Sequence, residues 1–263
     1  MVFPDEASDR EGLQAVCRLV EDRTGILLPV EKHAMVTARI ARRVQRLGLA
    51  RYASYAEHVV QPENASELTA LVDALTTNKT SFYRERAHFD VLARHLAGPA
   101  ARTASPRLWS AGCSSGQEPY TMAITALASG ASRVRILATD LSTRVLDIAR
   151  AGRYPFAEAA DIPKQKLATH FAREGAEVVV SPELRARVAF AQLNFRDSWP
   201  MRGPFEAIFC RNVMIYFDRA MRTDLVARFR ELLSPGGLLF IGLSEGLVGE
   251  HGLRLVAPGV YRR

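Results

Sequence analysis

The chain has 263 residues, 48% of them apolar, and carries a formal net charge of +7. This length and composition fit one large α/β domain, or a core domain with a smaller companion, and exclude a fibrous or disordered chain. Three widely spaced cysteines and the lack of an apolar run of about 18 residues indicate a cytoplasmic protein that does not insert into a membrane.

The first hundred residues predict helices. Apolar residues recur at helical spacing, and glycines follow the first two periodic segments. Residues 98–106, GPAARTASP, are small, polar and proline-bearing, which predicts a linker. We therefore expect an all-helical N-terminal domain over residues 1–97. Its helices are expected over residues 5–23, 30–47, 52–60, 66–75 and 82–96.

One face of the second predicted helix is basic. It carries four arginines at helical spacing: Arg39, Arg42, Arg43 and Arg46. Residues 31–51 hold six basic side chains and one acidic side chain, so much of the net positive charge lies here. A solvated helix face accounts for such a run as well as a docking surface does. The single sign of the charge keeps docking of an acidic partner open.

Residues 107–140 form the segment on which the function depends. The pattern predicts a strand over 107–111, a glycine loop from Gly112 to Gly116, a helix that opens at 117–119, and a second strand that ends at Asp140. The two glycines allow a tight turn and let a ligand approach bare backbone. Asp140 lies 24 residues after Gly116, near the spacing of about 20 at which an acid reaches ribose hydroxyls.

The same segment argues against a phosphate ligand. Its Gly-x-x-x-Gly loop is not the G-x-G-x-x-G fingerprint, and the chain contains no G-x-x-x-x-G-K-[ST] loop. Glu118 stands in the first turn of the predicted helix, where its carboxylate would repel a phosphate and attract an ammonium group. A ligand with a ribose, an amine and no phosphate is S-adenosylmethionine.

Strands and helices alternate through the rest of the chain. Strands over 188–195, 205–210 and 238–243 alternate with helices over 141–151 and 219–233, the latter stopped by Ser-Pro-Gly-Gly. This order predicts a mostly parallel, doubly wound α/β sheet with ligands at the carboxyl ends of its strands. Asp140, Asn194, Arg211 and Asn212 fall at such ends. Residues 152–186 interrupt the order and predict an inserted β subdomain for partner recognition or lid formation, with a decorative loop as the alternative.

Several motifs resemble one family. They are LTTN (75–78), FYRE (82–85), WSAGCSSGQEPY (109–120), ATD (138–140), ARAGRY (149–154), FCRNVMIYF (209–217) and LSPGG (233–237). On these residues the chain resembles the chemotaxis receptor methyltransferase family (CheR), bacterial enzymes that esterify glutamates on chemotaxis receptors. The resemblance implies a helical domain over 1–97 and a Rossmann-like methyltransferase domain over 107–263, with the inserted subdomain at 152–186.

The resemblance also implies a set of residues that line the S-adenosylmethionine pocket. Glu118 would pair with the methionine ammonium, and Asp140 would accept from the ribose hydroxyls. Arg84 and Tyr216 would face the transferred methyl group and the incoming carboxylate; a helix-start cation and a core ring are the alternatives for these two. The pocket set is Asn78, Thr80, Arg84, Gly112, Gly116, Glu118, Asp140, Asn194, Phe195, Arg211 and Asn212. Asn194 and Phe195 would border the adenine, and Arg211 and Asn212 would fix the methionine end.

The implied reaction transfers a methyl group to glutamate γ-carboxylates on chemoreceptors, so the chain would be a protein-glutamate O-methyltransferase. A carboxylate is already ionised at neutral pH, and therefore no catalytic base is needed. No metal is expected, because no histidine stands at a metal-ligand spacing. Cys113 and Cys210 are expected to be packing residues.

The implied partners are the acidic methylation helices of chemoreceptors. The turn region over residues 171–178 is short and holds a single glycine, so we expect no dependence on a receptor-tail pentapeptide, and we expect a monomer. Two alternatives remain. A nucleic-acid methyltransferase is disfavoured because aromatic residues do not interleave with the basic face. A non-catalytic adaptor that binds S-adenosylhomocysteine would keep Glu118 and Asp140 but show no turnover.

Overall fold

A computed structural model describes residues 6–98, 105–247 and 249–263. The chain folds into two compact units, each with more contacts within itself than with the other. The helical unit extends to Thr77 and includes Asn194–Ser198 and Tyr216–Asp218. The α/β unit comprises Asn78–Leu193, Trp199–Ile215 and Arg219–Arg263. Each unit has its own hydrophobic core.

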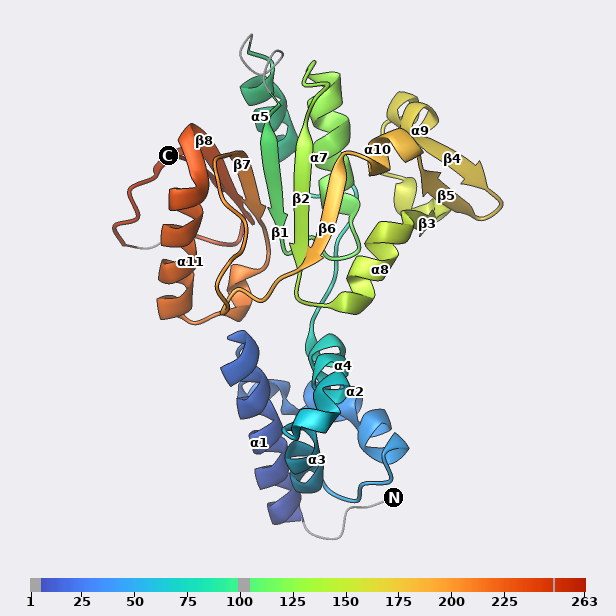
Figure 1. The fold of residues 1–263 in the computed structure, drawn as a ribbon, viewed down its shortest axis with the longest axis vertical. Helices are drawn as coiled ribbons and strands as arrows, with labels where there is room; N and C mark the ends of the chain where they lie inside the picture. The colour runs from blue at the N-terminus through green and yellow to red at the C-terminus, as the bar shows by residue number, and fades with distance from the viewer. Residues whose placement is uncertain (1–5, 99–104, 248) are drawn as a thin grey trace. The chain divides into compact units, whose positions relative to one another are not determined.

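The helical unit packs four α-helices around a small core (Figure 1). Its helices are α1 (Glu6–Thr24), α2 (His33–Arg46), α3 (Tyr52–Val59) and α4 (Ala65–Leu75), with 3-10 turns η1 (Val30–Lys32) and η2 (Pro62–Asn64). Val36, Ile40 and Val44 lie one turn apart on α2 and are buried, so they form the apolar face of this helix. α1 packs along α3, and α2 packs on α4.

The α/β unit is built on a seven-stranded sheet with the order β6-β2-β1-β7-β8-β10-β9. Its first five members, β6, β2, β1, β7 and β8, run parallel. The last two form an antiparallel hairpin at one edge. The strands are β1 (Arg107–Ala111), β2 (Arg135–Asp140), β6 (Val188–Gln192), β7 (Phe205–Cys210), β8 (Leu233–Ile241), β9 (Arg254–Ala257) and β10 (Val260–Arg262).

Helices cover the sheet, so the central strands are buried on both faces. Leu108 of β1 belongs to the core cluster beneath α5 and α7, whereas its neighbour Trp109 contacts Phe229 of α11, with ring centroids 5.3 Å apart. Phe209 and Phe240 stack at 4.0 Å on adjacent strands. The helices are α5 (Ala87–Leu96), α7 (Gln117–Ala128), α8 (Thr143–Ala151), α10 (Pro182–Arg185) and α11 (Arg219–Leu232), with the 3-10 turn η4 (Met214–Tyr216).

The insertion forms a separate three-stranded antiparallel sheet, β3-β5-β4, beside α8 and α10 (Figure 1). It comprises β3 (Arg153–Pro155), η3 (Phe156–Ala159), α9 (Lys164–His170), β4 (Phe171–Glu174) and β5 (Glu177–Val180). Tyr154 of β3 donates its hydroxyl to the carbonyl of Ser115 at 2.7 Å. Gln117 at the start of α7 donates to Glu158 at 3.0 Å. The predicted β subdomain is therefore tied directly to the glycine loop.

Four details differ from the sequence-based expectations. The helix expected from residue 82 begins at Ala87, because Tyr83 and Glu85 adopt left-handed backbone angles, with φ of 54° and 56°. Phe82, Phe89 and Leu92 join the core of the sheet, so the units divide at Thr77 rather than at residue 97. The helix expected over 219–233 ends at Leu232, as predicted, but Ser-Pro-Gly-Gly then forms an irregular stretch within β8, where the register with β7 shifts. The strand expected over 188–195 ends at Gln192.

The hairpin β9–β10 was not predicted at all. Of the linker expected over 98–106, residues 99–104 lie outside the described residues. In the part of the chain that the structure describes, no helix is long and apolar enough to cross a membrane.

Candidate cofactor site

The candidate site lies where the order of the sheet reverses. β1 and β7 are parallel neighbours, but the chain runs from β1 outward to β2 and β6 on one side and from β7 to β8 on the other. The loops that follow β1 and β7 therefore leave in opposite directions at the carboxyl edge of the sheet, which is the usual ligand position in doubly wound folds. Here they are Gly112–Gly116 and Arg211–Ile215.

The glycine loop is held by its own backbone. Gly112 and Cys113 both donate their N–H groups to the carbonyl of Thr139, at 2.8 and 2.9 Å. Gly112 and Gly116 have φ of 91° and 95°, which confirms the expected tight turn. A Cβ at Gly112 would lie 2.4 Å from Val213, and one at Gly116 would lie 2.8 Å from Ala149. Both glycines thus also serve close protein packing, a need that the sequence interpretation had assigned to the ligand.

Glu118 is a buried carboxylate with two fixed partners. It stands in the first turn of α7, is 7% exposed, and accepts from the hydroxyl of Ser110 at 2.7 Å and from Nε of Arg211 at 2.8 Å. Each carboxylate oxygen has two lone pairs, so both oxygens can accept a further bond. The side chain is therefore oriented in advance and retains acceptor capacity for a donor such as an ammonium group.

Arg211 is the centre of a buried charge network. Its Nη1 atom donates to the carbonyl of Arg84 at 2.7 Å and lies 3.3 Å from both Glu85 Oε2 and His88 Nδ1. Burial and the neighbouring Arg211 lower the pKa of His88, which favours the neutral imidazole. One guanidinium and two carboxylates, Glu85 and Glu118, then leave a net charge of −1 in this network. Such an environment favours a cationic ligand.

Asp140 is presented from the end of β2. Its Oδ2 accepts from the backbone N–H of Ser114 at 2.7 Å, and its Oδ1 accepts from the N–H of Ser142 at 3.0 Å. The carboxylate thus joins the glycine loop to the loop after β2. Glu118 and Asp140 are brought to one edge of one sheet, as the sequence predicts.

The segment before α5 contributes a third loop. The hydroxyl of Ser114 donates to the carbonyl of Asn78 at 3.0 Å, which ties this segment to the glycine loop. Arg84 is half-buried, and its guanidinium donates to the carbonyl of Lys79 at 2.9 Å. Thr80 is half-buried in the same loop.

Backbone strain is concentrated in these three loops. Within residues 6–98, 105–247 and 249–263, the non-glycine residues with positive φ are Tyr83, Glu85, Ser114 and Asn212. Each such residue costs of order 1 kcal/mol and persists only where its surroundings fix it, as they often do at functional sites. Asn212 also keeps a buried side-chain oxygen, Oδ1, that has no hydrogen-bond partner. A buried acceptor without a partner is a position that a bound ligand can satisfy.

Three predicted site residues belong to the helical unit instead. Asn194 donates its side-chain amide to the carbonyl of Arg23 at 2.7 Å. Phe195 is buried and meets Phe217 edge-on. Tyr216 accepts at its backbone carbonyl from Leu27 at 2.8 Å, and Lys32 lies over its ring. Their place in a cofactor site stays a prediction.

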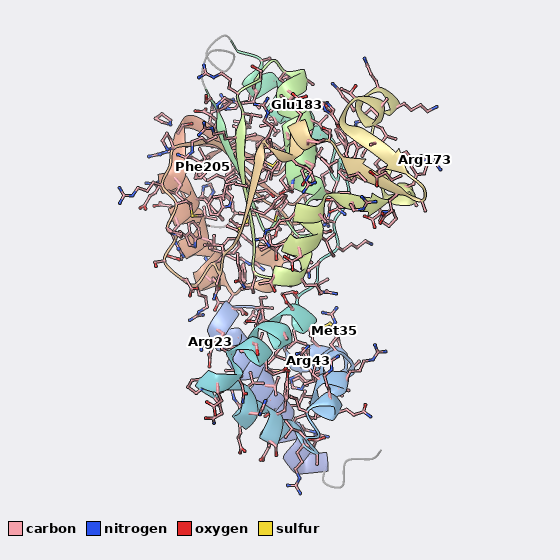
Figure 2. All side chains as sticks on the ribbon, turned by 45° about the vertical axis from the view of Figure 1, so that its right-hand side comes forward. Arg23, Met35, Arg43, Arg173, Glu183 and Phe205 are labelled. Carbon is pink, nitrogen blue, oxygen red and sulfur yellow. The ribbon has the colours of Figure 1, made fainter. Side chains whose placement is uncertain are left out.

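The arginines of α2 divide into two pairs. Arg39 donates to the carbonyls of Leu75 and Thr76 at the end of α4. Arg43, labelled in Figure 2, forms two hydrogen bonds of 2.7 Å with Glu67, which also accepts from the hydroxyl of Tyr55. These two arginines stabilise the helical unit. Arg42 and Arg46 are exposed.

Several site residues escaped the sequence analysis. Ser110 contacts Glu118 eight positions along the chain. Glu85, His88 and Glu245 contact predicted residues through bonds that link distant parts of the chain. In the sequence, Glu85 and Ser110 are marked only by their positions inside the FYRE and WSAGCSSGQEPY motifs. All three cysteines are buried and free, and burial raises the pKa of the Cys113 and Cys210 thiols, as expected for packing residues.

The sheet order, the glycine loop and the two oriented carboxylates suit an S-adenosylmethionine-dependent methyltransferase, and the family matches show that the chain is one. Residues 78–258 match the family described as CheR methyltransferase, SAM binding domain, and residues 11–76 match CheR methyltransferase, all-alpha domain. The chain belongs to the CheR methyltransferase family, and S-adenosylmethionine is its cofactor.

Relatives with assigned names agree with this family. The chemotaxis protein methyltransferase of Salmonella typhimurium is 42% identical and spans 91% of this chain and 86% of its own. Chemotaxis protein methyltransferase 2 of Pseudomonas aeruginosa is 41% identical and spans 96% and 92%. Among solved structures, PKMT2 from Rickettsia typhi in complex with AdoHcy is 17% identical, covers 63% of this chain and 26% of its own, and has a TM-score of 0.40, too distant a likeness to support an argument.

Proposed function

We propose that the chain transfers the methyl group of S-adenosylmethionine to the γ-carboxylate of specific glutamates on chemotaxis receptors. The observation that carries the proposal is the oriented pair of carboxylates, Glu118 and Asp140, at the switch point of the sheet. Relatives named chemotaxis protein methyltransferase support the chemotactic setting.

Each carboxylate has a role that suits its surroundings. Glu118, in a network of net charge −1, would hold the methionine ammonium of the cofactor, with Ser110 and Arg211 fixing its oxygens. Asp140 would accept from the ribose hydroxyls, since two backbone amides set its orientation. Arg211 then acts by holding Glu118 in place. Asn212 Oδ1 is an acceptor for a further donor of the cofactor.

The remaining pocket residues keep the roles that their family positions suggest. Asn78, Thr80 and the two loop glycines would line the S-adenosylmethionine pocket, and Asn194 and Phe195 would border the adenine. Arg84, whose guanidinium is oriented by the carbonyl of Lys79, would steer the incoming carboxylate. Tyr216 would face the transferred methyl group and the incoming carboxylate.

The chemistry asks the protein for orientation rather than acid–base work. A glutamate carboxylate, with a pKa of about 4.3, is ionised at neutral pH. The cofactor supplies a methyl group already activated on a sulfonium. The chain must align the attacking oxygen with that group, an effect that can supply about 7–11 kcal/mol. The buried residues of the site therefore bind and orient, and none needs to remove a proton.

A label-transfer experiment tests the proposal. The protein is incubated with methyl-labelled S-adenosylmethionine and the cytoplasmic fragment of a chemoreceptor, and the product is then treated with alkali. Volatile labelled methanol is the expected result, because it marks a carboxyl ester. Label that survives alkali would indicate N-methylation, and binding without labelling would indicate an adaptor; either result contradicts the proposal.

We further propose that the chain acts without a pentapeptide tether. The β4–β5 hairpin turns within Glu174–Glu177 through a single glycine, Gly175. The exposed side chain of Arg153 pairs with both Glu174 and Glu177, and Arg173, labelled in Figure 2, lies over Phe156 at 4.2 Å. The charged side chains at this hairpin thus contact β3 and η3 of the same inserted subdomain. Calorimetry with receptor-tail pentapeptides should detect no binding at micromolar concentration, and micromolar affinity would overturn this part.

A further inference from the structure

Glu245 joins the loops that follow β7 and β8. Its side-chain Oε2 accepts from the backbone N–H of Gly242 at 2.6 Å and from that of Asn212 at 2.8 Å, while Oε1 accepts from Ile215 at 3.2 Å. The residue is 9% exposed. A buried carboxylate that receives three backbone donors holds them strongly, because hydrogen bonds to a charged acceptor are about twice as strong as neutral ones.

The loop that Glu245 holds is also packed tightly on two sides. On one side Val213 lies against Gly112, where a Cβ would come within 2.4 Å. On the other, a Cβ at Gly242 would lie 2.5 Å from Asn212 Nδ2 and 2.8 Å from Glu245 Oε2. Asn212 is thus fixed between the glycine loop and the loop after β8.

Two features of Asn212 are energetically unfavourable and persist only because the surrounding residues hold it in place. Its φ of 58° is unfavourable for a residue with a side chain, and its buried Oδ1 has no partner. A chain free to relax would turn the backbone or expose the amide. The carboxylate of Glu245 binds the N–H of this same residue and so holds the strained conformation.

We propose that Glu245 is a positioning residue of the cofactor site, whose carboxylate presents the Asn212 side-chain amide to the cofactor. The proposal rests on the function proposed above, since it takes Asn212 as a cofactor contact. Within the described residues, the side-chain hydrogen bonds of Glu245 come from backbone N–H groups, so we expect its effect on the cofactor to pass through Asn212.

A double-mutant cycle tests this route. S-adenosylhomocysteine binding is measured by calorimetry for the unchanged protein, Glu245→Gln, Asn212→Gly and the double variant. Glycine is chosen at 212 because it accepts positive φ while removing the amide. Each single variant should weaken binding roughly fivefold to tenfold, as expected for loss of a charged or buried hydrogen bond. In the Asn212→Gly background, Glu245→Gln should weaken binding by less than about twofold.

Two further variants separate positioning from folding. Glu250→Gln makes the same change at an exposed glutamate of the same segment and should leave affinity unchanged. Gly242→Ala forces a methyl group between Asn212 and Glu245 and should weaken binding while the fold is retained. KM for the receptor fragment should stay constant throughout, whereas KM for the cofactor should rise.

Equal weakening by Glu245→Gln in both backgrounds would overturn the proposal, and so would an unchanged affinity in either single variant. Should Glu245→Gln fail to fold, Glu245→Asp takes its place in the cycle, because its shorter side chain cannot hold the same three backbone N–H groups. Failure of the methyl-transfer proposal is separable, because it would appear as absent methanol release while this binding cycle still holds.

Discussion

The two charged regions of the molecule differ in how their side chains are held. In the α/β unit, Glu118 and Arg211 are buried, bonded to each other, and retain capacity for a ligand. On α2 of the helical unit, Arg39 and Arg43 bind α4, and only Arg42 and Arg46 of that face are exposed. A helical face with regularly spaced charges can therefore contain both side chains that stabilise the fold and side chains that are exposed to a partner. Only the contacts in the structure distinguish the two kinds.

The largest effect is expected from Glu118→Gln. The change removes the charge that pairs with Arg211 and would pair with the cofactor ammonium. S-adenosylhomocysteine binding should weaken roughly 100-fold, which corresponds to about 3 kcal/mol from a charged hydrogen bond. Calorimetry measures this, with Glu231→Gln on the exposed side of α11 as the matched control. An affinity close to that of the unchanged protein would remove Glu118 from the site.

Reversing the charge of the two exposed arginines of α2 should give the next largest effect. Arg42→Glu combined with Arg46→Glu is expected to lower kcat/KM for a receptor fragment roughly tenfold at low salt, because long-range attraction raises the encounter rate. The loss should shrink as salt increases, and cofactor affinity should not change. A loss that is independent of salt would argue against docking through this face.

A smaller effect, on stability alone, is expected from Arg43→Ala. The guanidinium forms a bidentate pair with Glu67, whose side chain is 14% exposed, so its loss should cost about 1–2 kcal/mol of unfolding free energy. Both tryptophans, Trp109 and Trp199, lie in the α/β unit. Circular dichroism should report the loss while tryptophan fluorescence stays unchanged. Arg42→Ala should change neither signal.

The smallest effect concerns acid pH. Burial lowers the pKa of His88 and His95 below the ordinary value of 6.5. The unfolded chain therefore binds more protons than the folded chain between the folded pKa values and 6.5, so stability should fall as pH drops through this window. Denaturation followed by tryptophan fluorescence at about pH 7.5 and about pH 5.5 measures the difference. His88→Asn should reduce it, and an equal pH dependence in this variant would exclude His88.

The sequence predicts the strands and the glycine loop of the site better than the segments and side chains that hold them in place. β1 matches the expected strand at both ends, and Asp140 ends β2 as expected, because buried parallel strands and glycine turns leave a local signature. Tyr83 and Glu85 adopt positive φ although neither is glycine, so no residue type marked the end of the expected helix. The β9–β10 hairpin has strands of four and three residues, too short for a periodic pattern.

The side chains that hold Glu118 and Asn212 in place could not be predicted from the sequence for a different reason. Arg211 pairs with a residue 93 positions earlier, and Glu245 binds a backbone amide 33 positions earlier. Such pairs depend on which strands become neighbours. Arg211 was assigned to the methionine end, and its contact with Glu118 emerges only from the order β1-β7 in the sheet.

The bond from Tyr154 to Ser115 has a practical consequence for chimeric enzymes. Exchanging the inserted sheet between relatives would remove the donor to the partly buried Ser115 carbonyl unless the donor insert also supplies a tyrosine at this position. Three residues further along the chain stands Glu118. An insert chosen only for its partner preference would therefore be expected to change cofactor affinity as well. A chimera that retains Tyr154 of this chain would keep the hydrogen bond to Ser115.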